Sequence, residues 1–329
     1  MSEFSSASKL TDRAVAHLRS LIDDAPLAHD RYTIHEIVGR GGMGAVYRAH
    51  DELLQRDVAI KVLDERAPMS FKTTQRLKRE ATILARLEHP GIVPVHDAGE
   101  LGDGRAFYVM QLVRGVRLDE YARGGISRGD VLRLILRVCE IVGFANAQGV
   151  VHRDLKPSNI MIGPFGEVLV LDWGVAKVLN EVDGLSTNSN SAAVSKNIEE
   201  TKDGMVVGTH GYMSPEQASG ASGDVTQTAD VYSLGVILRE LLSKVRENAD
   251  KALSAIAERA TSLEPRDRYG ATIALAAEIR RWLDGEPVVA YHESALEQVM
   301  RVYRRHQTAI WLVGSYVALR VTVFFWRRI

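Results

Sequence analysis

The sequence predicts an α+β protein of two lobes, a β-rich N-terminal lobe over residues 31–113 and a mainly helical C-terminal lobe over residues 114–285. Two observations carry this prediction. Apolar residues alternate from Tyr32 to about Ile60 around a glycine-rich turn, as in half-buried strands. After Leu118 helical segments dominate. At 329 residues the chain is long enough for one large domain or two ordinary ones.

The lobes are preceded by residues 1–30, an expected N-terminal extension in which residues 9–22 fit a short amphipathic packing or linker helix. Further elements are expected as a strand over 57–63, a helix over 71–88, and short strands around 92–95 and 107–112. A loop at 150–174 and a polar segment at 180–205 interrupt the helices of the second lobe. The polar segment is too poor in apolar residues to order itself.

The composition is that of a globular protein, with 46% hydrophobic residues, 25% charged residues and a formal net charge of −1. Near-neutral charge gives no general attraction to nucleic acid. Cys139 is the only cysteine and lies in an apolar helical run, so we expect a buried structural thiol. A single cysteine excludes an internal disulfide framework and fits a reducing, cytosolic environment. No signal peptide is expected, because residues 2–8 lack an apolar core.

Residues 309–326 predict a C-terminal transmembrane helix, preceded by a basic juxtamembrane segment over 286–308. The apolar run is about long enough for a thin bilayer, and Trp311 and Trp326 lie near its ends, as interfacial aromatics do. Arg320 opposes this interpretation unless its side chain reaches the nearer interface. The basic residues before the run would keep the preceding domain cytoplasmic, anchored to the inner (cytoplasmic) membrane. A buried core helix or an interfacial amphipathic helix are the alternatives.

The most informative segment is residues 152–159, His-Arg-Asp-Leu-Lys-Pro-Ser-Asn. It places the carboxylate of Asp154, the ammonium of Lys156 and the amide of Asn159 on one short loop. These groups suit orienting or deprotonating a hydroxyl, neutralising a phosphate and holding a metal. Asp172 follows an apolar strand thirteen residues after Asn159, so the two side chains can share a metal. Hard oxygen ligands of this kind suit Mg²⁺, which bridges phosphates.

A glycine-rich turn over residues 39–46 lies between two strand patterns, where glycine lets the backbone approach phosphate. The rival interpretation, a dinucleotide-binding turn, requires a helix directly after the last glycine, and here a strand follows. Lys61 lies within the apolar strand 58–63, and Glu80 on the following helix is a candidate partner. Because Lys78 and Arg79 flank it, Glu80 could equally belong to a solvated helix face.

In this order the segments resemble the eukaryotic-like (Hanks-type) Ser/Thr protein kinases of bacteria, over about residues 32–285. The resemblance implies the bilobal kinase fold and transfer of the γ-phosphoryl group of Mg-ATP to Ser or Thr hydroxyls of protein substrates. Mn²⁺ is an alternative to Mg²⁺. The resemblance also implies a role in bacterial signalling and autophosphorylation of the activation loop. A homodimer is possible for autophosphorylation in trans. The sequence names no substrate and no activating signal.

The resemblance also assigns the site residues. Lys61, paired with Glu80, would hold the α and β phosphates, while Asp154 would accept or orient the substrate proton. Lys156 would stabilise the transferring group, and Asn159 and Asp172 would bind Mg²⁺. Met110 would be the gatekeeper of the adenine pocket, followed by the hinge 111–113. The implied ATP-binding residues are Val38, Gly39, Gly41, Gly44, Val46, Ala59, Lys61, Met110, Gln111, Val113 and Met161.

Other positions would have supporting roles. The resemblance implies a structural role for Thr209, an ion pair between Glu216 and Arg268, and an Asp230 that supports the catalytic loop. Arg153 and Lys177 would receive a phosphate on the activation loop. The candidate phosphorylation sites are Thr201, then Thr187 and Ser186.

Two departures from the kinase pattern bear on function. Trp173 stands where Phe is usual in the Asp-Phe-Gly motif. The stretch 243–263 is about half as long as in relatives, so a helix that docks protein substrates is expected to be missing or vestigial. A non-catalytic kinase-like scaffold is therefore the alternative function. A small-molecule kinase is a third, which residues 209–216 and Arg268 argue against.

Overall fold

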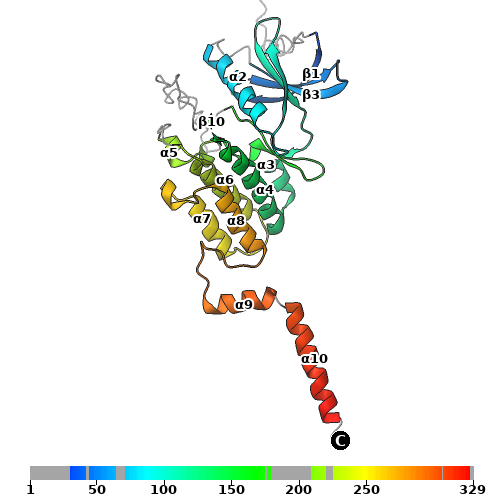
Figure 1. Ribbon diagram of the computed structural model, residues 1–329, viewed down its shortest axis with the longest axis vertical. Helices are drawn as coiled ribbons and strands as arrows, with labels where there is room; N and C mark the ends of the chain where they lie inside the picture. Colours follow the sequence, from blue (N-terminus) through cyan, green and yellow to red (C-terminus); the bar gives the residue numbers. More distant parts are fainter. Residues whose placement is uncertain are drawn as a thin grey trace, which may run out of the picture. The chain divides into compact units, whose positions relative to one another are not determined.

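The computed structural model describes residues 30–41, 44–63, 71–174, 176–178, 209–219, 225–305 and 307–326. These residues fall into two compact units. The N-terminal unit holds the described residues up to Glu88 together with Val93–Val113, and the C-terminal unit holds His89–Ile92 and the described residues from Arg114 onward. The first is mainly β-sheet and the second mainly helical (Figure 1), which confirms the predicted α+β, two-lobe class. The helix expected over residues 9–22 lies outside the described residues.

The described part of the N-terminal unit is one antiparallel sheet with one helix. The sheet has five strands in the order β1-β2-β3-β5-β4. The strands are β1 (Tyr32–Gly41), β2 (Gly44–Asp51), β3 (Arg56–Leu63), β4 (Val95–Glu100) and β5 (Ala106–Gln111). Helix α2 (Phe71–Arg86) packs against β4 and β5.

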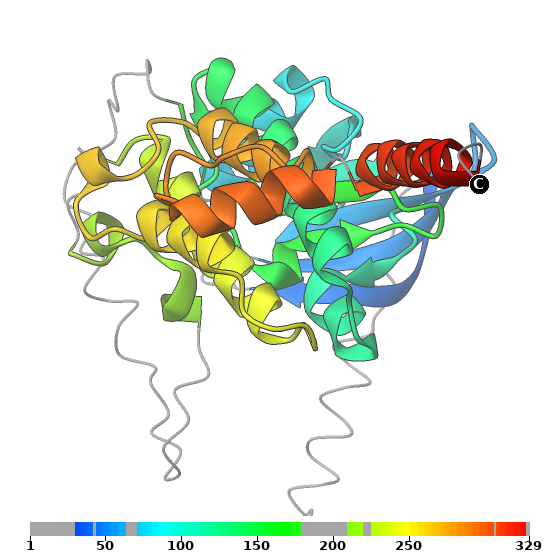
Figure 2. The same cartoon turned by 90° about the horizontal axis from the view of Figure 1, so that it is seen from below.

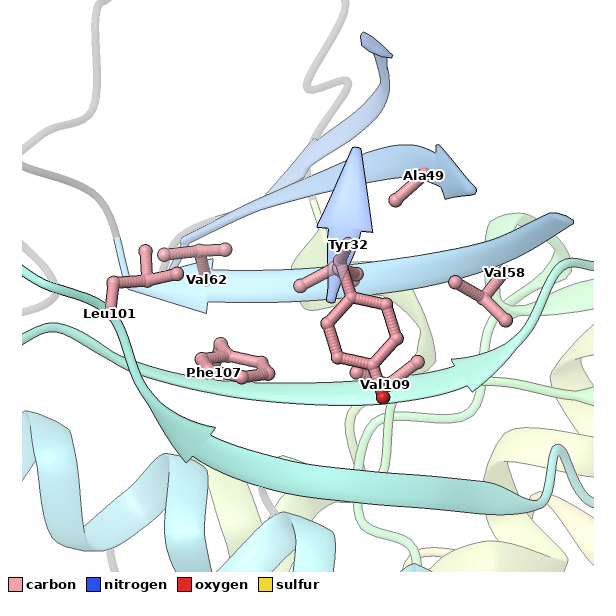
Figure 3. Packing of buried hydrophobic residues seen from close by; sticks show 8 residues of the cluster. Tyr32, Ala49, Val58, Val62, Leu101, Phe107 and Val109 are labelled. Carbon is pink, nitrogen blue, oxygen red and sulfur yellow. The ribbon is translucent and has the colours of Figure 1, made fainter. Parts of the chain in front are cut away.

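One face of this sheet forms the apolar core of the unit. Successive side chains of a strand point to opposite faces, so alternate residues of β3 share the core with their partners on the neighbouring strands. Figure 3 shows this cluster around the Tyr32 ring, which meets the Phe107 ring edge-on with 6.3 Å between centroids. The buried members are Tyr32, Ala49, Val58, Ile60, Val62, Leu101, Phe107 and Val109. The remaining residues of β3, Ala59 and Lys61 among them, must therefore face the other side.

The C-terminal unit consists of helices with short strands between them. Its strands are β6 (Val116–Arg117), β7 (Val150–Val151), β8 (Ile160–Ile162), β9 (Val168–Val170) and β10 (Lys177–Val178). Its α-helices are α3 (Leu118–Tyr121), α4 (Arg128–Ala147), α5 (Pro215–Ala218), α6 (Thr228–Ser243), α7 (Lys251–Ala260), α8 (Thr272–Leu283), α9 (Ala295–Arg305) and α10 (Gln307–Trp326). The short helical turns are η1 (Ala122–Gly124), η2 (Pro157–Asn159), η4 (Thr209–Tyr212) and η5 (Pro265–Asp267).

Helices α4, α6, α7 and α8 pack together as the core of this unit (Figure 1). Their contacts are close: a methyl group added at Gly235 of α6 would lie 2.6 Å from the Cβ atom of Ala260 at the end of α7. Cys139 lies fully buried on α4, and burial raises the pKa of its thiol, which confirms the predicted structural cysteine.

The connection between α6 and α7 is short and is tied to the start of α4. Between α6 and η5 the described chain forms a single helix, α7, whose buried side chains pack into the core. Arg128, at the first turn of α4, donates a hydrogen bond to the Asn248 carbonyl and forms an ion pair with Glu247 at 3.2 Å. Its guanidinium also lies 5.9 Å from the centre of a Trp282 ring. One arginine thus holds the connection against α4 and α8.

Two helices follow the bundle, α9 and α10; Figure 2 shows α9 beside the ends of α7 and α8. A helix forms where the sequence predicts a transmembrane segment over 309–326, and α10 covers that range. Among the described residues, however, no helix is both long and apolar enough to cross a bilayer. The predicted span is therefore not supported. Arg320 and polar residues such as Gln307 and Ser315 interrupt the apolar character of α10.

Candidate active site

The glycine-rich turn joins β1 to β2 in the N-terminal unit. Gly41 lies opposite Gly44 at the end of the antiparallel pair, and Gly39 lies opposite Val46. A Cβ atom at Gly44 would come within 2.1 Å of the Val62 carbonyl oxygen, whereas one at Gly39 would meet nothing within 4 Å. Close packing against β3 thus requires a residue without a side chain at position 44. At Gly39 the space beside the backbone is open. Residues 42 and 43, at the tip, lie outside the described residues.

Lys61 and Glu80 form a charge pair inside the N-terminal unit. The Lys61 Nζ atom lies 2.7 Å and 2.9 Å from the two carboxylate oxygens of Glu80, which is 1% exposed. The Tyr108 hydroxyl donates a third hydrogen bond to the same carboxylate, at 3.0 Å. Glu80 therefore does not belong to a solvated helix face. The pairing implied by the resemblance is present, and Tyr108, which the sequence did not indicate, adds to it.

Several expected ATP-binding residues share the sheet face that carries Lys61. Val46 lies opposite Lys61 across β2 and β3, and Ala59 lies opposite Met110 across β3 and β5. Because directly opposed residues lie on one face, Val46, Ala59, Lys61 and Met110 all face away from the Tyr32 core. Val38 is largely exposed on β1, and Gln111 ends β5 with Val113 shortly after. Met161 lies on β8, in the C-terminal unit.

The predicted catalytic loop, residues 152–159, is held by a buried carboxylate of α6. Both Asp230 oxygens accept hydrogen bonds from the loop backbone, one from the amide of His152 and one from that of Arg153, each at 3.0 Å. The Asn146 side chain adds a third bond of 3.0 Å. Arg153 has a φ of 71°, a strained value for a residue with a side chain. These bonds fix the loop in that conformation, so Asp230 has the supporting position that was expected.

Asp154, Lys156 and Asn159 lie together on this loop. The Lys156 ammonium lies 2.8 Å from an Asp154 carboxylate oxygen. The Asn159 amide nitrogen donates to the Asp154 carbonyl at 2.8 Å and to its carboxylate at 3.2 Å. Each side chain of the Asp154–Lys156 pair keeps about a fifth of its surface exposed. A carboxylate and an ammonium therefore lie side by side, both reachable from solvent.

The donor set fits a hard divalent metal ion. Because the Asn159 amide nitrogen is bonded to Asp154, its amide oxygen is turned away from that residue. Asp172, with a φ of 61°, has an exposed carboxylate. It follows Leu171, whose amide donates to the Asn159 carbonyl at 2.8 Å, so the two predicted ligands come from adjoining backbone. Within the described ranges, no group of three or more His, Cys, Asp or Glu side chains is suited to hold a metal. Asn159 and Asp172 would hold such an ion with an amide oxygen and one carboxylate, the hard oxygen donors that suit divalent metals bound together with phosphates.

His152 and Trp173 connect the two predicted metal-binding segments. The His152 Nδ1 atom accepts a hydrogen bond from the Asp154 amide at 3.2 Å, so its Nε2 atom carries the proton and donates to the Leu171 carbonyl at 3.0 Å. The ring of Trp173 packs on the His152 ring with 4.6 Å between centroids. The larger ring at the usual Phe position thus packs at a tilt against a histidine ring.

Glu216 and Arg268 form the expected ion pair. Two guanidinium nitrogens each lie 2.8 Å from a different carboxylate oxygen, and Arg268 is completely buried. It also donates to the Ser262, Leu263 and Thr228 carbonyls. Burial is the largest single influence and raises the pKa of the Glu216 carboxyl, but the hydrogen bonds and positive charge of Arg268, a backbone hydrogen bond and Ser214 together outweigh it and hold that pKa below its ordinary value.

Gln217 was not indicated by the sequence but contacts the catalytic loop directly. Its amide nitrogen donates to the Arg153 carbonyl at 2.9 Å, while its amide oxygen accepts from the Ser214 hydroxyl at 2.9 Å. Helix α5 is thereby joined to the residue that precedes Asp154. A glutamine at the start of a short helix carries no chemical signal in the sequence, so only the fold reveals it.

The regulatory candidates are only partly described. Lys177 lies on β10 opposite Val151 of β7, two residues before Arg153, so the backbone brings this basic pair into the same region. Thr209 begins η4. The candidate phosphorylation sites Thr201, Thr187 and Ser186 lie outside the described residues.

Comparisons with known proteins agree with this geometry. The protein kinase domain family matches residues 32–263. A serine/threonine-protein kinase PknD of Protochlamydia amoebophila is 34% identical over 307 residues, covering 79% of this chain and 30% of the relative. The PknD of Chlamydia trachomatis serovar D is 33% identical over 302 residues, covering 78% of this chain and 32% of the relative. The chain thus spans about a third of the length of these relatives.

Among solved structures, the Mycobacterium tuberculosis PknI kinase domain superposes with a TM-score of 0.57 at 24% sequence identity. The match covers 78% of this chain and 98% of that one. This likeness shows a shared fold. With the ordered set of site residues and the sequence matches, it leads to one conclusion: the chain belongs to the protein kinase domain family, among the bacterial Hanks-type Ser/Thr protein kinases.

Proposed function

We propose that this protein is an active, ATP-dependent Ser/Thr protein kinase. The observation that carries the proposal is the cluster of Asp154, Lys156 and Asn159 on a loop fixed by Asp230. The cluster offers a carboxylate that can accept a hydroxyl proton beside an ammonium that can neutralise a phosphoryl group. The buried Lys61–Glu80 pair supplies a second oriented ammonium. Phosphoryl transfer depends mainly on such positioning and charge stabilisation.

In the proposed mechanism Asp154 orients the acceptor hydroxyl and takes its proton as the oxygen attacks the γ-phosphorus. The bond between the γ-phosphorus and the β–γ bridging oxygen breaks, and ADP is the leaving group. Lys156 balances the negative charge that spreads over the transferring group. Lys61, held by Glu80, binds the α and β phosphates. Asn159 and Asp172 would hold Mg²⁺, which neutralises and aligns the phosphates; Mn²⁺ has the same preference for hard oxygen donors.

The nucleotide is proposed to lie along the Lys61 face of the N-terminal sheet. Val46 and Ala59 would contact the adenine ring together with Met161, Met110 would act as gatekeeper, and the hinge 111–113 would hydrogen-bond the base. The backbone of residues 39–44 would cover the phosphates, which the open space beside Gly39 allows. This arrangement explains why these apolar residues and Lys61 share one face.

Regulation by autophosphorylation belongs to the same proposal. A phosphothreonine adds about −1.5 to −2 charge and can order a loop through arginine contacts. Arg153 and Lys177 would receive that phosphate, with Thr201 as the first candidate site and Thr187 and Ser186 as the next. We place the kinase domain in the cytoplasm, as part of a signalling pathway, and expect transphosphorylation within a homodimer.

The decisive experiment is an autophosphorylation assay of the full chain with Mg-ATP beside its Asp154→Asn variant. Loss of the general base should reduce the rate about 10²- to 10⁴-fold. Asp284→Asn, the same change at an exposed helix end, is the matched control and should retain full activity. Mapping the phosphates by mass spectrometry would identify the modified residues. Equal rates for wild type and Asp154→Asn would instead favour the kinase-like scaffold.

A further inference from the structure

Helix α9 carries an apolar stripe that the described part of the chain leaves exposed. Four of its large apolar residues, Leu296, Val299, Met300 and Tyr303, are spaced by three or four positions, so these four lie on one side of the helix. Their exposed fractions are 77%, 67%, 48% and 38%, in that order. An amphipathic surface helix normally turns such a stripe toward its own domain. In α9 the stripe is exposed.

The polar side of α9 is what holds it to the C-terminal unit. Glu297 accepts hydrogen bonds from Lys251 of α7 at 3.4 Å and from the Tyr291 hydroxyl at 3.1 Å. Arg301 binds Glu293 at 2.9 Å and the Gly285 carbonyl at 3.3 Å. At about 100° per residue, position 301 lies on the side opposite the stripe and position 297 lies outside it, about 110° from its centre. These contacts fix α9 with its apolar side turned outward.

The charge of this region differs from that of the whole chain. Residues 293–329 contain six arginines, two glutamates and no aspartate or lysine, whereas the complete chain has a formal net charge of −1. The next helix, α10, also exposes large apolar side chains, including Trp311, Tyr316 and Trp326. The end of the chain thus combines positive charge with exposed aromatic and aliphatic surface.

We propose that α9 binds to the surface of an anionic lipid bilayer, with its apolar stripe at the level of the headgroups and acyl chains. An exposed stripe on a helix within a cationic segment is the pattern of interfacial helices. Each basic residue near an anionic lipid surface adds to the electrostatic attraction. A second copy of this chain is a poorer occupant, because its equally cationic segment would repel the first. The proposal extends beyond phosphoryl transfer, since it assigns a docking surface outside the catalytic residues.

The test places an environment-sensitive fluorophore on either side of α9 in the full chain. Val299→Cys labels the stripe, and Gln298→Cys, the matched control, labels a neighbouring exposed position outside it. Cys139 is completely buried and will not compete for the label under native conditions. Each protein is titrated with vesicles of phosphatidylcholine alone and of phosphatidylcholine mixed with phosphatidylglycerol, the second set repeated with brominated lipids and with high salt.

The proposal predicts a blue shift and quenching by brominated lipid at position 299 with the anionic vesicles only. High salt should reverse the signal, and position 298 should change little. Equal signals at both positions, or no signal at 299 while the chain still cosediments with vesicles, would overturn it and assign membrane contact to another segment. A blue shift at 299 that grows with protein concentration in the absence of lipid would also overturn it, in favour of a second copy.

Discussion

The Glu80 carboxylate accepts hydrogen bonds from both Lys61 and Tyr108. The tyrosine matters because it donates from β5, so the orientation of the carboxylate on α2 depends on donors from two strands, β3 and β5. The position of the Lys61 ammonium therefore depends on a hydroxyl that takes no direct part in the chemistry.

Tyr108→Phe should lower kcat/KM for ATP about tenfold, because a hydrogen bond to a charged group contributes roughly 1.5–3 kcal/mol. The ring remains, so the packing of β5 should survive. Steady-state phosphorylation at varied ATP concentration measures the effect. Tyr121→Phe, the same change at an exposed position, is the control. An unchanged kcat/KM would show that Lys61 is positioned without Tyr108.

The Glu216–Arg268 pair gives the protein a specific acid sensitivity. Because the native pKa of Glu216 is depressed, its contribution to stability is complete above the unfolded pKa of about 4.3 and is lost as pH falls through the lower native value. The advantage of wild type over Glu216→Gln in free energy of unfolding should be constant near neutral pH and shrink below about pH 4.3. Urea unfolding at several pH values measures it. An advantage independent of pH would contradict this account.

At this scale the sequence was informative where chemistry is concentrated in one motif. Asp154, Lys156 and Asn159 are neighbours along the chain, so their meeting follows from spacing. Glu216 and Arg268 lie 52 residues apart, and their pairing came only from family resemblance. Tyr108 remained hidden because its role depends on strand register, which a single sequence does not reveal.

At the scale of the elements, the β1–β2 hairpin contains two glycines, Gly39 and Gly44, whose surroundings leave different amounts of space for a side chain. Gly44 lies against the β3 backbone, where a Cβ atom would come within 2.1 Å of a carbonyl oxygen. A Cβ atom at Gly39 would meet nothing within 4 Å.

Gly44→Ala should lower the free energy of unfolding by about 1–3 kcal/mol, as overpacking does. Gly39→Ala should leave the unfolding temperature nearly at the wild-type value. Thermal unfolding of the two variants compares them directly; equal losses would refute the distinction.

The elements themselves were largely visible in the sequence, with one instructive exception. The strand expected over 57–63 is β3 (Arg56–Leu63), and the helix expected over 71–88 is α2 (Phe71–Arg86). The strand expected around 92–95 is instead β4, which begins at Val95. Ile92 forms only an isolated bridge with Val170. Pro94 has no amide hydrogen to continue a strand, and the alternation within β4 is concealed by small and charged residues.

For the whole molecule, the C-terminal unit extends beyond the matched kinase region. The buried carboxylate of Glu278 accepts hydrogen bonds from the backbone amides of Val289 and Ala290 at 2.7 Å and 3.0 Å, and Val288 is buried. A domain boundary at Gly285 would remove all three contacts. The segment after α8 therefore takes part in the core of this unit.

A fragment of residues 31–285 should consequently be less stable than one of residues 31–291, by at least about 2 kcal/mol, because a buried carboxylate loses two donors. Urea midpoints of the two fragments measure the difference. Glu278→Gln in the longer fragment serves as a check, since it should lose part of the same stability. Fragments of equal stability would support the boundary at 285.

The whole-molecule predictions were mixed for a physical reason. The two lobes were evident in the sequence, because the alternating apolar residues typical of strands are replaced by the apolar spacing typical of helices at one place in the chain. The helices at the end of the chain were harder to interpret, since apolar content alone does not distinguish a helix that spans a membrane from one that exposes apolar side chains on a surface. The direction in which α9 turns its stripe depends on contacts of Glu297 and Arg301 that have no sequence signature.

The arginine that ties the α6–α7 connection to α4 also constrains the order in which the molecule assembles. Arg128 and Asn248 are 120 residues apart in the chain, and closing a contact of such separation costs chain entropy unless other contacts have already brought its ends together. We therefore expect this hydrogen bond to form after α4, α6 and α8 have packed together. The base of the bundle is therefore completed late in folding, and interactions formed after the transition state slow unfolding more than they speed folding. Arg128 is therefore expected to lengthen the lifetime of the native state by slowing unfolding.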